Sequence, residues 1–154
     1  MELARLLDGR VSLVFVGNEL DGDDGFGPRL FASISHLHAD GVQLIDASTV
    51  PENFIGQVTD FRPDKVIVFD AGDFSGSPGD IRVFGGRDLS GASISSHRMP
   101  LKMFSRMFEK EGITVIFVLV QAGGTGIGQD MSPGVARILA DLSAKLLEAL
   151  SCRT

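Results

Sequence analysis

The residues best suited to chemistry lie in an acidic, glycine-rich loop. The segment GNELDGDDGFG at 17–27 follows an apolar run, and it carries four carboxylates, those of Glu19, Asp21, Asp23 and Asp24. A glycine-rich loop between a strand and a helix is typical of a phosphate site. These carboxylates would repel a phosphate, however, and the segment contains no Lys. A cation is therefore the better ligand, unless Asp23 and Asp24 only place negative charge at the amino end of the next helix.

Two further candidates stand later in the chain. Asp70 directly follows the apolar run VIVF, and His97 stands in the segment SSHRMP ahead of an expected helix. Taken alone, Asp70 could cap backbone N–H groups of the next turn, and a lone histidine is ordinarily a surface or core residue. His36 and His38 lie near the carboxyl end of a predicted helix, whose dipole suits an imidazolium, so we interpret both as structural.

Two carboxylates and one imidazole are a reasonable ligand set for a divalent transition metal such as nickel or zinc, and they leave coordination positions open. Asp24, Asp70 and His97 make up this candidate set. Their spacing has none of the regularity of a zinc finger or of an H-E-x-x-H helix. Spacing alone therefore leaves the metal hypothesis open.

Short apolar runs predict the strands that position these residues. The runs are continuously apolar rather than alternating, which is typical of parallel strands covered on both faces. They occupy 12–16, 42–45, 66–69 and 114–120, with a short edge strand at 81–84. Strands and helices alternate along the chain, which predicts one α/β domain over 1–154, with three layers and a twisted, mostly parallel sheet of about five strands flanked by helices on both faces. Ligand sites in such folds lie at the carboxyl ends of the strands.

Apolar spacing also predicts the helices. One begins at Phe26 and stops near Gly41, another covers about 99–108, and a terminal helix has Ser132 as N-cap and Pro133 in its first position. Thr49 and Glu52 form a capping-box pattern that opens a short helix, with Pro51 inside its first turn. Alternatively, Glu52 or Asn53 lines the site from the end of the second strand.

Composition excludes several classes of partner. Of the 154 residues, 44% are hydrophobic and 22% are charged, and the net charge is −6, which opposes nucleic-acid binding. No apolar stretch approaches the ~20 residues of a membrane span, and no basic segment leads into an apolar one at the start. The single cysteine, Cys152, cannot form an internal disulfide. We therefore expect a cytoplasmic protein, and a monomer by default.

Four segments together resemble a known family. VGNELDGDDGFGPRL, STVPEN, FDAGD and SSHRMPL, in this order, resemble the [NiFe]-hydrogenase maturation endopeptidases. They are most similar to the branch that processes the large subunits of formate-hydrogenlyase-type or membrane-bound hydrogenases. The resemblance covers about 14–135. It departs after the 114–120 run, where the family tends to show a Gly-Ile-Gln-Pro-like segment and this chain keeps Gln121 without the proline, so we assign no role to that loop.

The resemblance implies a specific reaction. Members of the family remove a short C-terminal extension from the hydrogenase large-subunit precursor after nickel has been inserted. The metal-contacting residues of the family fall on Asp24, Asp70 and His97, which are thereby expected to be both the metal ligands and the catalytic residues. Nickel is expected to arrive with the substrate protein. Attack would come from a metal-polarised water, or from a water deprotonated by a carboxylate such as Asp70.

Two alternatives stay open at this stage. A receiver-like phosphoacceptor domain would also place an acidic pair after its first strand, here Asp23 and Asp24, and an Asp, here Asp70, at the end of another. Two features disagree with this alternative: the pair lies seven residues past the end of the first strand, and no Lys ends a later strand. A non-catalytic nickel-binding maturation chaperone could use the same three metal ligands. A serine or cysteine peptidase is disfavoured because the chain has no nucleophile-elbow motif and Cys152 lies far along the chain from the candidate site.

Overall fold

Among the described residues, six strands form one twisted, mostly parallel sheet. The computed structural model describes residues 2–89, 94–96, 100–124 and 126–153. The parallel strands are β1 (Val11–Val16), β2 (Val42–Ser48), β3 (Lys65–Asp73) and β6 (Thr114–Gln121). The order is β2-β1-β3-β6-β4, where β4 (Ile81–Gly85) runs antiparallel to β6 at the edge. The short β5 (Ser95–Ser96) pairs with the end of β3. The predicted parallel sheet is confirmed, and β5 is an additional strand.

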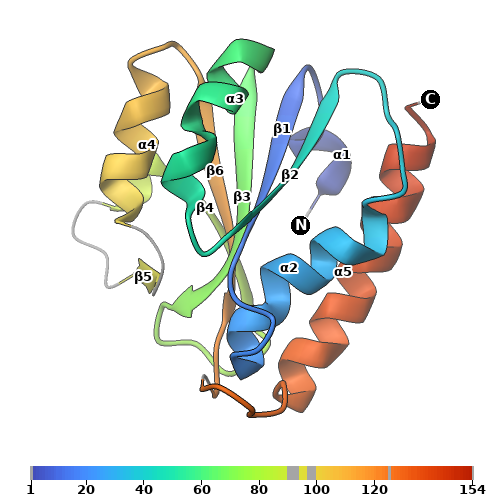
Figure 1. Ribbon diagram of the computed structural model, residues 1–154, viewed down its shortest axis with the longest axis vertical. Helices are drawn as coiled ribbons and strands as arrows, with labels where there is room; N and C mark the ends of the chain where they lie inside the picture. Colours follow the sequence, from blue (N-terminus) through green and yellow to red (C-terminus); the bar gives the residue numbers. More distant parts are fainter. Residues whose placement is uncertain (1, 90–93, 97–99, 125, 154) are drawn as a thin grey trace.

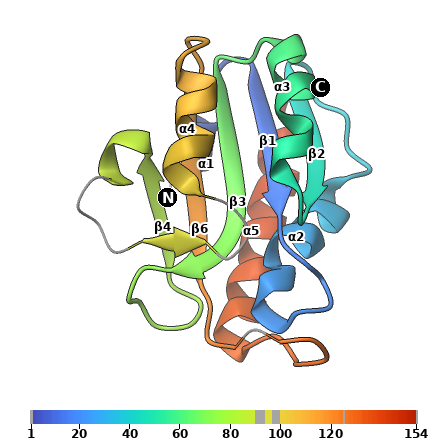
Figure 2. The same ribbon diagram turned by 60° about the vertical axis from the view of Figure 1, so that its left-hand side comes forward.

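Helices cover both faces of this sheet (Figures 1 and 2). One face carries α1 (Leu3–Leu6), α2 (Phe26–Ile34) and α5 (Pro133–Ser151). The other carries α3 (Ile55–Phe61) and α4 (Leu101–Glu109). Short 3-10 turns precede or link these elements: η1 (Gly22–Gly25), η2 (Pro51–Phe54) and η3 (Gly86–Leu89). The predicted three-layer α/β arrangement is therefore confirmed. Among the described helices, none is long and apolar enough to cross a membrane.

The side chains of β3 alternate between two apolar cores. Ile67 and Phe69 enter the core under α2 and α5, whereas Val66 and Val68 enter the core under α3 and α4. Phe69 stacks on Phe15 of β1 with their ring centroids 5.0 Å apart. Fully burying one such apolar side chain contributes about 1.5–3 kcal/mol. Because both faces of the strand are covered, the sequence of the strand is continuously apolar.

Two local predictions are wrong. The helix α2 ends at Ile34, and Gly41 instead adopts a φ of +71° in the turn that leads into β2. Near the end of α2 the Ser33 hydroxyl donates a hydrogen bond to the Leu30 carbonyl, a side-chain interaction that competes with the helix ladder. The second error concerns the expected capping box. The N-cap of η2 is Val50 and no side chain caps it, although Pro51 does occupy the first helical position.

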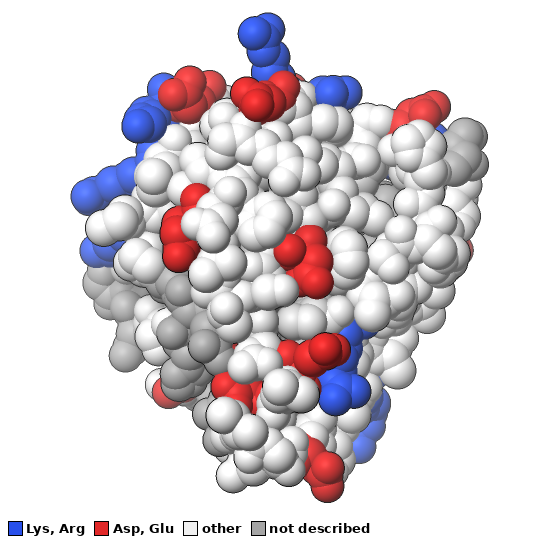
Figure 3. Space-filling view, in the orientation of Figure 1, with Lys and Arg blue, Asp and Glu red and all other residues white. Residues whose placement is uncertain are grey.

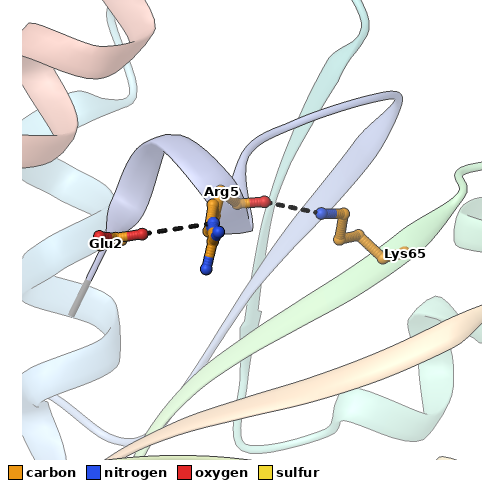
Figure 4. A network of polar contacts seen from close by, with 3 residues as sticks. All are labelled: Glu2, Arg5 and Lys65. Atoms are coloured by element: carbon orange, nitrogen blue, oxygen red, sulfur yellow. Dashed lines mark hydrogen bonds and ion pairs between the residues drawn. The ribbon is translucent and has the colours of Figure 1, made fainter.

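Side chains also fasten the edge of the sheet opposite the carboxyl ends of the parallel strands. Lys65 at the start of β3 donates a hydrogen bond to the Arg5 carbonyl at 2.9 Å (Figure 4). The side chain of Arg5 is exposed, and its Nε lies 3.4 Å from Glu2 Oε2. The Arg153 guanidinium donates to three backbone carbonyls, those of Leu7, Gly9 and Asp40. These contacts hold the strand-entry loops of β1 and β2 against the end of α5.

Candidate functional site

Two glycines bring the first loop back onto the end of β1. A Cβ at Gly17, where φ is +146°, would lie 2.0 Å from the Asp24 carbonyl oxygen. A Cβ at Gly27 would lie 2.1 Å from the Val16 carbonyl oxygen. Only glycine permits such close approach. The Asn18 N–H then donates to the Asp24 carbonyl at 3.0 Å. The glycines of this motif therefore fix the main chain of Asp24 next to the end of β1.

The four carboxylates of this loop have different environments. Asp23 and Asp24 lie in η1 with exposed fractions of 0% and 2%, whereas Glu19 is exposed and Asp21 is half-buried. The Asp24 N–H donates to the Asp21 carbonyl at 3.0 Å, and η1 packs against β3. The loop thus places two carboxylates inside the protein, beside the strand that carries Asp70.

Asp23 holds the β6–α5 loop. Its carboxylate accepts hydrogen bonds from the N–H groups of Gly123 (2.7 Å), Gly124 (2.9 Å) and Ser132 (2.6 Å), and from the Ser132 hydroxyl (2.7 Å). Burial raises the pKa of Asp23, but hydrogen bonds from the Ser132 side chain and from the three N–H groups outweigh it, so the pKa lies below its ordinary value. Ser132 is the N-cap residue of α5, as predicted, but its hydroxyl contacts Asp23 rather than capping the helix.

Asp70 is buried inside β3 rather than beyond its end. The pairing of β3 with β1 stops at Phe69, whereas pairing with β6 continues through Asp70 to Gly72. Asp70 is therefore the first β3 residue beyond the ladder with β1. The Ala71 N–H donates to Asp70 Oδ1 at 2.8 Å, which is the local capping expected as the alternative role of Asp70. The Ser96 hydroxyl donates to Asp70 Oδ2.

The close approach of β5 brings Ser96 to Asp70. In the ladder, Gly72 pairs with Ser96, and a Cβ at Gly72 would lie 2.4 Å from the Ser95 carbonyl oxygen. Glycine at 72 is therefore required for this pairing. His97, the next residue in the sequence, lies outside the described residues. Within the described part of the chain, no group of three His, Cys, Asp or Glu side chains could hold a metal ion.

Gln121 is a residue of this edge that the sequence analysis left without a role. Its side-chain oxygen accepts hydrogen bonds from the N–H groups of Phe74 (2.9 Å) and Gly76 (3.0 Å). Its amide nitrogen donates to Asp73 Oδ1 (3.2 Å) and to the Ala122 carbonyl (3.0 Å). Gln121 therefore fastens the β3–β4 loop to the end of β6. The signal in the sequence is a polar residue that directly ends a long apolar run.

A groove of about 380 Å³ lies beside the first loop, between α2 and the end of β2. Its walls include Asn18, Leu20, Phe31, Asp46 and Ser48. A larger cavity of about 570 Å³ lies between α1 and the end of α5. That cavity is at the opposite edge of the sheet, whereas the smaller groove adjoins the acidic loop of the candidate site.

Fold and site together describe an α/β protein with buried carboxylates at the carboxyl edge of a parallel sheet. A family model described as hydrogenase maturation protease matches residues 31–149, which include Asp70 and His97 but not Asp24. The hydrogenase 3 maturation protease of Escherichia coli K12 is 31% identical over 121 residues, 78% of each chain. The chain therefore belongs to the hydrogenase maturation protease family, and it is a peptidase.

Solved structures agree with this assignment. The chain is similar to the [NiFe] hydrogenase maturation protease HycI of Thermococcus kodakarensis, with a TM-score of 0.85, 26% identity and coverage of 97% of this chain and 98% of that one. It is also similar to the endopeptidase HycI of Escherichia coli, with a TM-score of 0.77, 27% identity and coverage of 90% and 89%. The resemblance stated from the sequence is confirmed, and it displaces the receiver-like alternative.

Proposed function

We propose that this chain is an endopeptidase that removes the C-terminal extension of a [NiFe]-hydrogenase large-subunit precursor after nickel insertion. Membership of the hydrogenase maturation protease family supports the reaction class. The observation that carries the proposal is the burial of two carboxylates, Asp24 in η1 and Asp70 in β3, on elements that pack together at the carboxyl edge of the sheet. Burying a carboxylate costs free energy, and carboxylates kept buried at the ligand-binding edge of such a sheet are candidates for a functional site.

In this proposal, Asp24, Asp70 and His97 contact the nickel ion that the precursor carries. Imidazole and carboxylate groups suit nickel, and three ligands leave room for those of the substrate. The Ser96 hydroxyl donates to Asp70 Oδ2 and thereby orients the carboxylate, and Ser96 directly precedes His97 in the sequence. The attacking water would be polarised by the nickel or deprotonated by Asp70.

The proposal also covers where and how the enzyme works. We infer that it acts in the cytoplasm and as a monomer, with nickel supplied by the substrate rather than held by the free enzyme. A single exposed cysteine agrees with a reducing compartment. A tight nickel site in the free protein without cleavage would favour the chaperone alternative.

The test is cleavage of the precursor in its nickel-loaded and metal-free forms, with the new C-terminus identified by mass spectrometry. We expect the wild-type protein to cleave only the nickel-loaded form, and Asp24→Ala, Asp70→Ala and His97→Ala to abolish cleavage. Matched controls are exposed residues of the same types, Asp60→Ala and His38→Ala. Equal cleavage of the metal-free precursor would overturn the role of nickel, and normal cleavage by a site variant would remove that residue from the site.

A further inference from the structure

Exposed apolar side chains gather on the loops around the candidate site. Within the described residues, five large apolar side chains are exposed. Three of them follow the carboxyl ends of parallel strands: Leu20 after β1 (66% exposed), Val50 after β2 (38%) and Ile127 after β6 (83%). We name these three residues the apolar rim. Exposed apolar groups gathered beside a site are typical of a protein-binding surface.

Hydrogen bonds hold the rim in place. The Gly128 N–H donates to the Leu20 carbonyl at 3.0 Å, which joins the loop of Ile127 to the loop of Leu20. The Gly17 N–H donates to the Ser48 carbonyl at 2.8 Å, which joins the first loop to the segment before Val50. Because the three loops are connected through their backbones, the rim is a preorganised surface, and preorganisation lowers the entropic cost of binding.

The charge of the same loops restricts the partner. The segments 17–25, 46–54 and 121–132 contain no Lys or Arg, and they carry exposed carboxylates such as Glu19, Asp46 and Asp130. Figure 3 shows several acidic side chains over the lower part of this face, with basic side chains directly beside them on the right and further acidic ones near the top. A second copy of this chain would bring its own carboxylates against these, and nucleic acids or anionic lipids would be repelled in the same way.

We propose that the apolar rim is the surface on which the folded substrate protein docks. The complementary surface of that protein is an apolar patch bordered by Lys or Arg side chains. This inference rests on the proposed function, because a peptidase that acts on a folded precursor must hold it around the site where the extension is cut. The groove beside Leu20 then lies under the docked protein and offers Asp46 to a basic side chain.

The test measures kcat and KM for processing of the nickel-loaded precursor. Leu20→Ser combined with Ile127→Ser is the main variant, and Val50→Ser is a second. Matched controls are Met103→Ser (60% exposed, on α4) and Val83→Ser (38% exposed, on β4). We expect the main variant to raise KM about tenfold or more with kcat nearly unchanged, as for loss of central apolar contacts in an interface. The controls should stay within about twofold.

Charge gives an independent readout. Glu19→Lys and Asp130→Lys should also raise KM for the precursor, and added salt should raise the KM of the wild-type enzyme. If the wild type cleaves the precursor while rim variants and controls behave alike, the docking proposal is overturned and the proposed function stands. If the wild-type enzyme does not cleave the nickel-loaded precursor, the proposed function is overturned, and the docking proposal that rests on it is overturned with it. A dimer of the free enzyme that Ile127→Ser dissociates would assign the rim to a second copy and overturn the proposal.

Discussion

The Ser132 hydroxyl donates a hydrogen bond to Asp23 Oδ2 at 2.7 Å, across 109 positions of sequence. This contact joins the acidic loop after β1 to the first turn of α5. Asp24, the neighbour of Asp23, belongs to the candidate catalytic set. Asp23 therefore fastens two loops, whereas its neighbour Asp24 is the residue that we propose as a nickel ligand.

Removing the Asp23 carboxylate should destabilise the protein. Asp23→Ala leaves three N–H groups and one hydroxyl without their acceptor. We expect the free energy of unfolding to fall by about 3 kcal/mol, since each unsatisfied buried donor costs about 1–3 kcal/mol and water satisfies some of them. Urea unfolding measures the change. Asp130→Ala, an exposed carboxylate in the same loop, is the control, and an equal loss in both would contradict the role of Asp23.

The same carboxylate should make stability depend on acid pH. Hydrogen bonding holds the folded pKa of Asp23 below its ordinary value. The contribution of the ionised Asp23 carboxylate to folding stability is therefore fully present above the unfolded pKa of about 3.9. It is lost as the pH falls through the folded pKa. The stability difference between wild type and Asp23→Asn should be constant from about pH 7 to 5 and should shrink below about pH 4. A difference that stays constant down to pH 3 would argue against this assignment.

Ser96 should act by positioning Asp70. Its hydroxyl donates to Asp70 Oδ2, and a hydrogen bond to a charged group contributes about 1.5–3 kcal/mol. Ser96→Ala should therefore lower kcat for precursor processing about tenfold, with a small change in melting temperature. Ser96→Thr keeps the hydroxyl and should restore most of the activity. Ser95→Ala, the exposed neighbour in β5, should behave as wild type. Failure of the threonine variant to recover activity would show that Ser96 serves only packing.

Gln121 should stabilise the β3–β4 loop against local unfolding. Gln121→Leu removes the acceptor for the N–H groups of Phe74 and Gly76. We expect a loss of about 2 kcal/mol in stability and faster amide hydrogen exchange at these two residues. Exchange at Val118, in the middle of β6, should change only in proportion to global stability. Unchanged protection of the Phe74 and Gly76 amides would contradict this role.

The sheet could be predicted from the sequence because burial on both faces demands continuous apolar runs, as in β1 and β3. The end of α2 could not, since the apolar positions continue to Leu37 while the chain has already left the helix at Ile34. The two-residue strand β5 has no apolar pattern at all, and its pairing depends on Gly72 in β3, which lies 24 positions before its partner Ser96.

The candidate site could be predicted only in part. Because Asp24 and Asp70 each follow an apolar run, the sequence predicts both at the carboxyl ends of strands, and both are buried there. The role of Asp23 depends on donors from residues 123–132, which no local pattern near 23 reveals. The role of Gln121 likewise depends on a loop that lies far from it in sequence.

The alternation of β3 has a consequence for any redesign of this enzyme. Phe69 and Asp70 are neighbours that face opposite sides of the same strand, and the parallel ladder with β6, together with the ladder with β1 up to Phe69, fixes which of them faces which side. Deleting or inserting a single residue upstream in β3 would exchange their positions, turning the carboxylate into the apolar core under α2 and α5 and the aromatic ring out of it. Length-changing edits are therefore far more dangerous in this strand than substitutions.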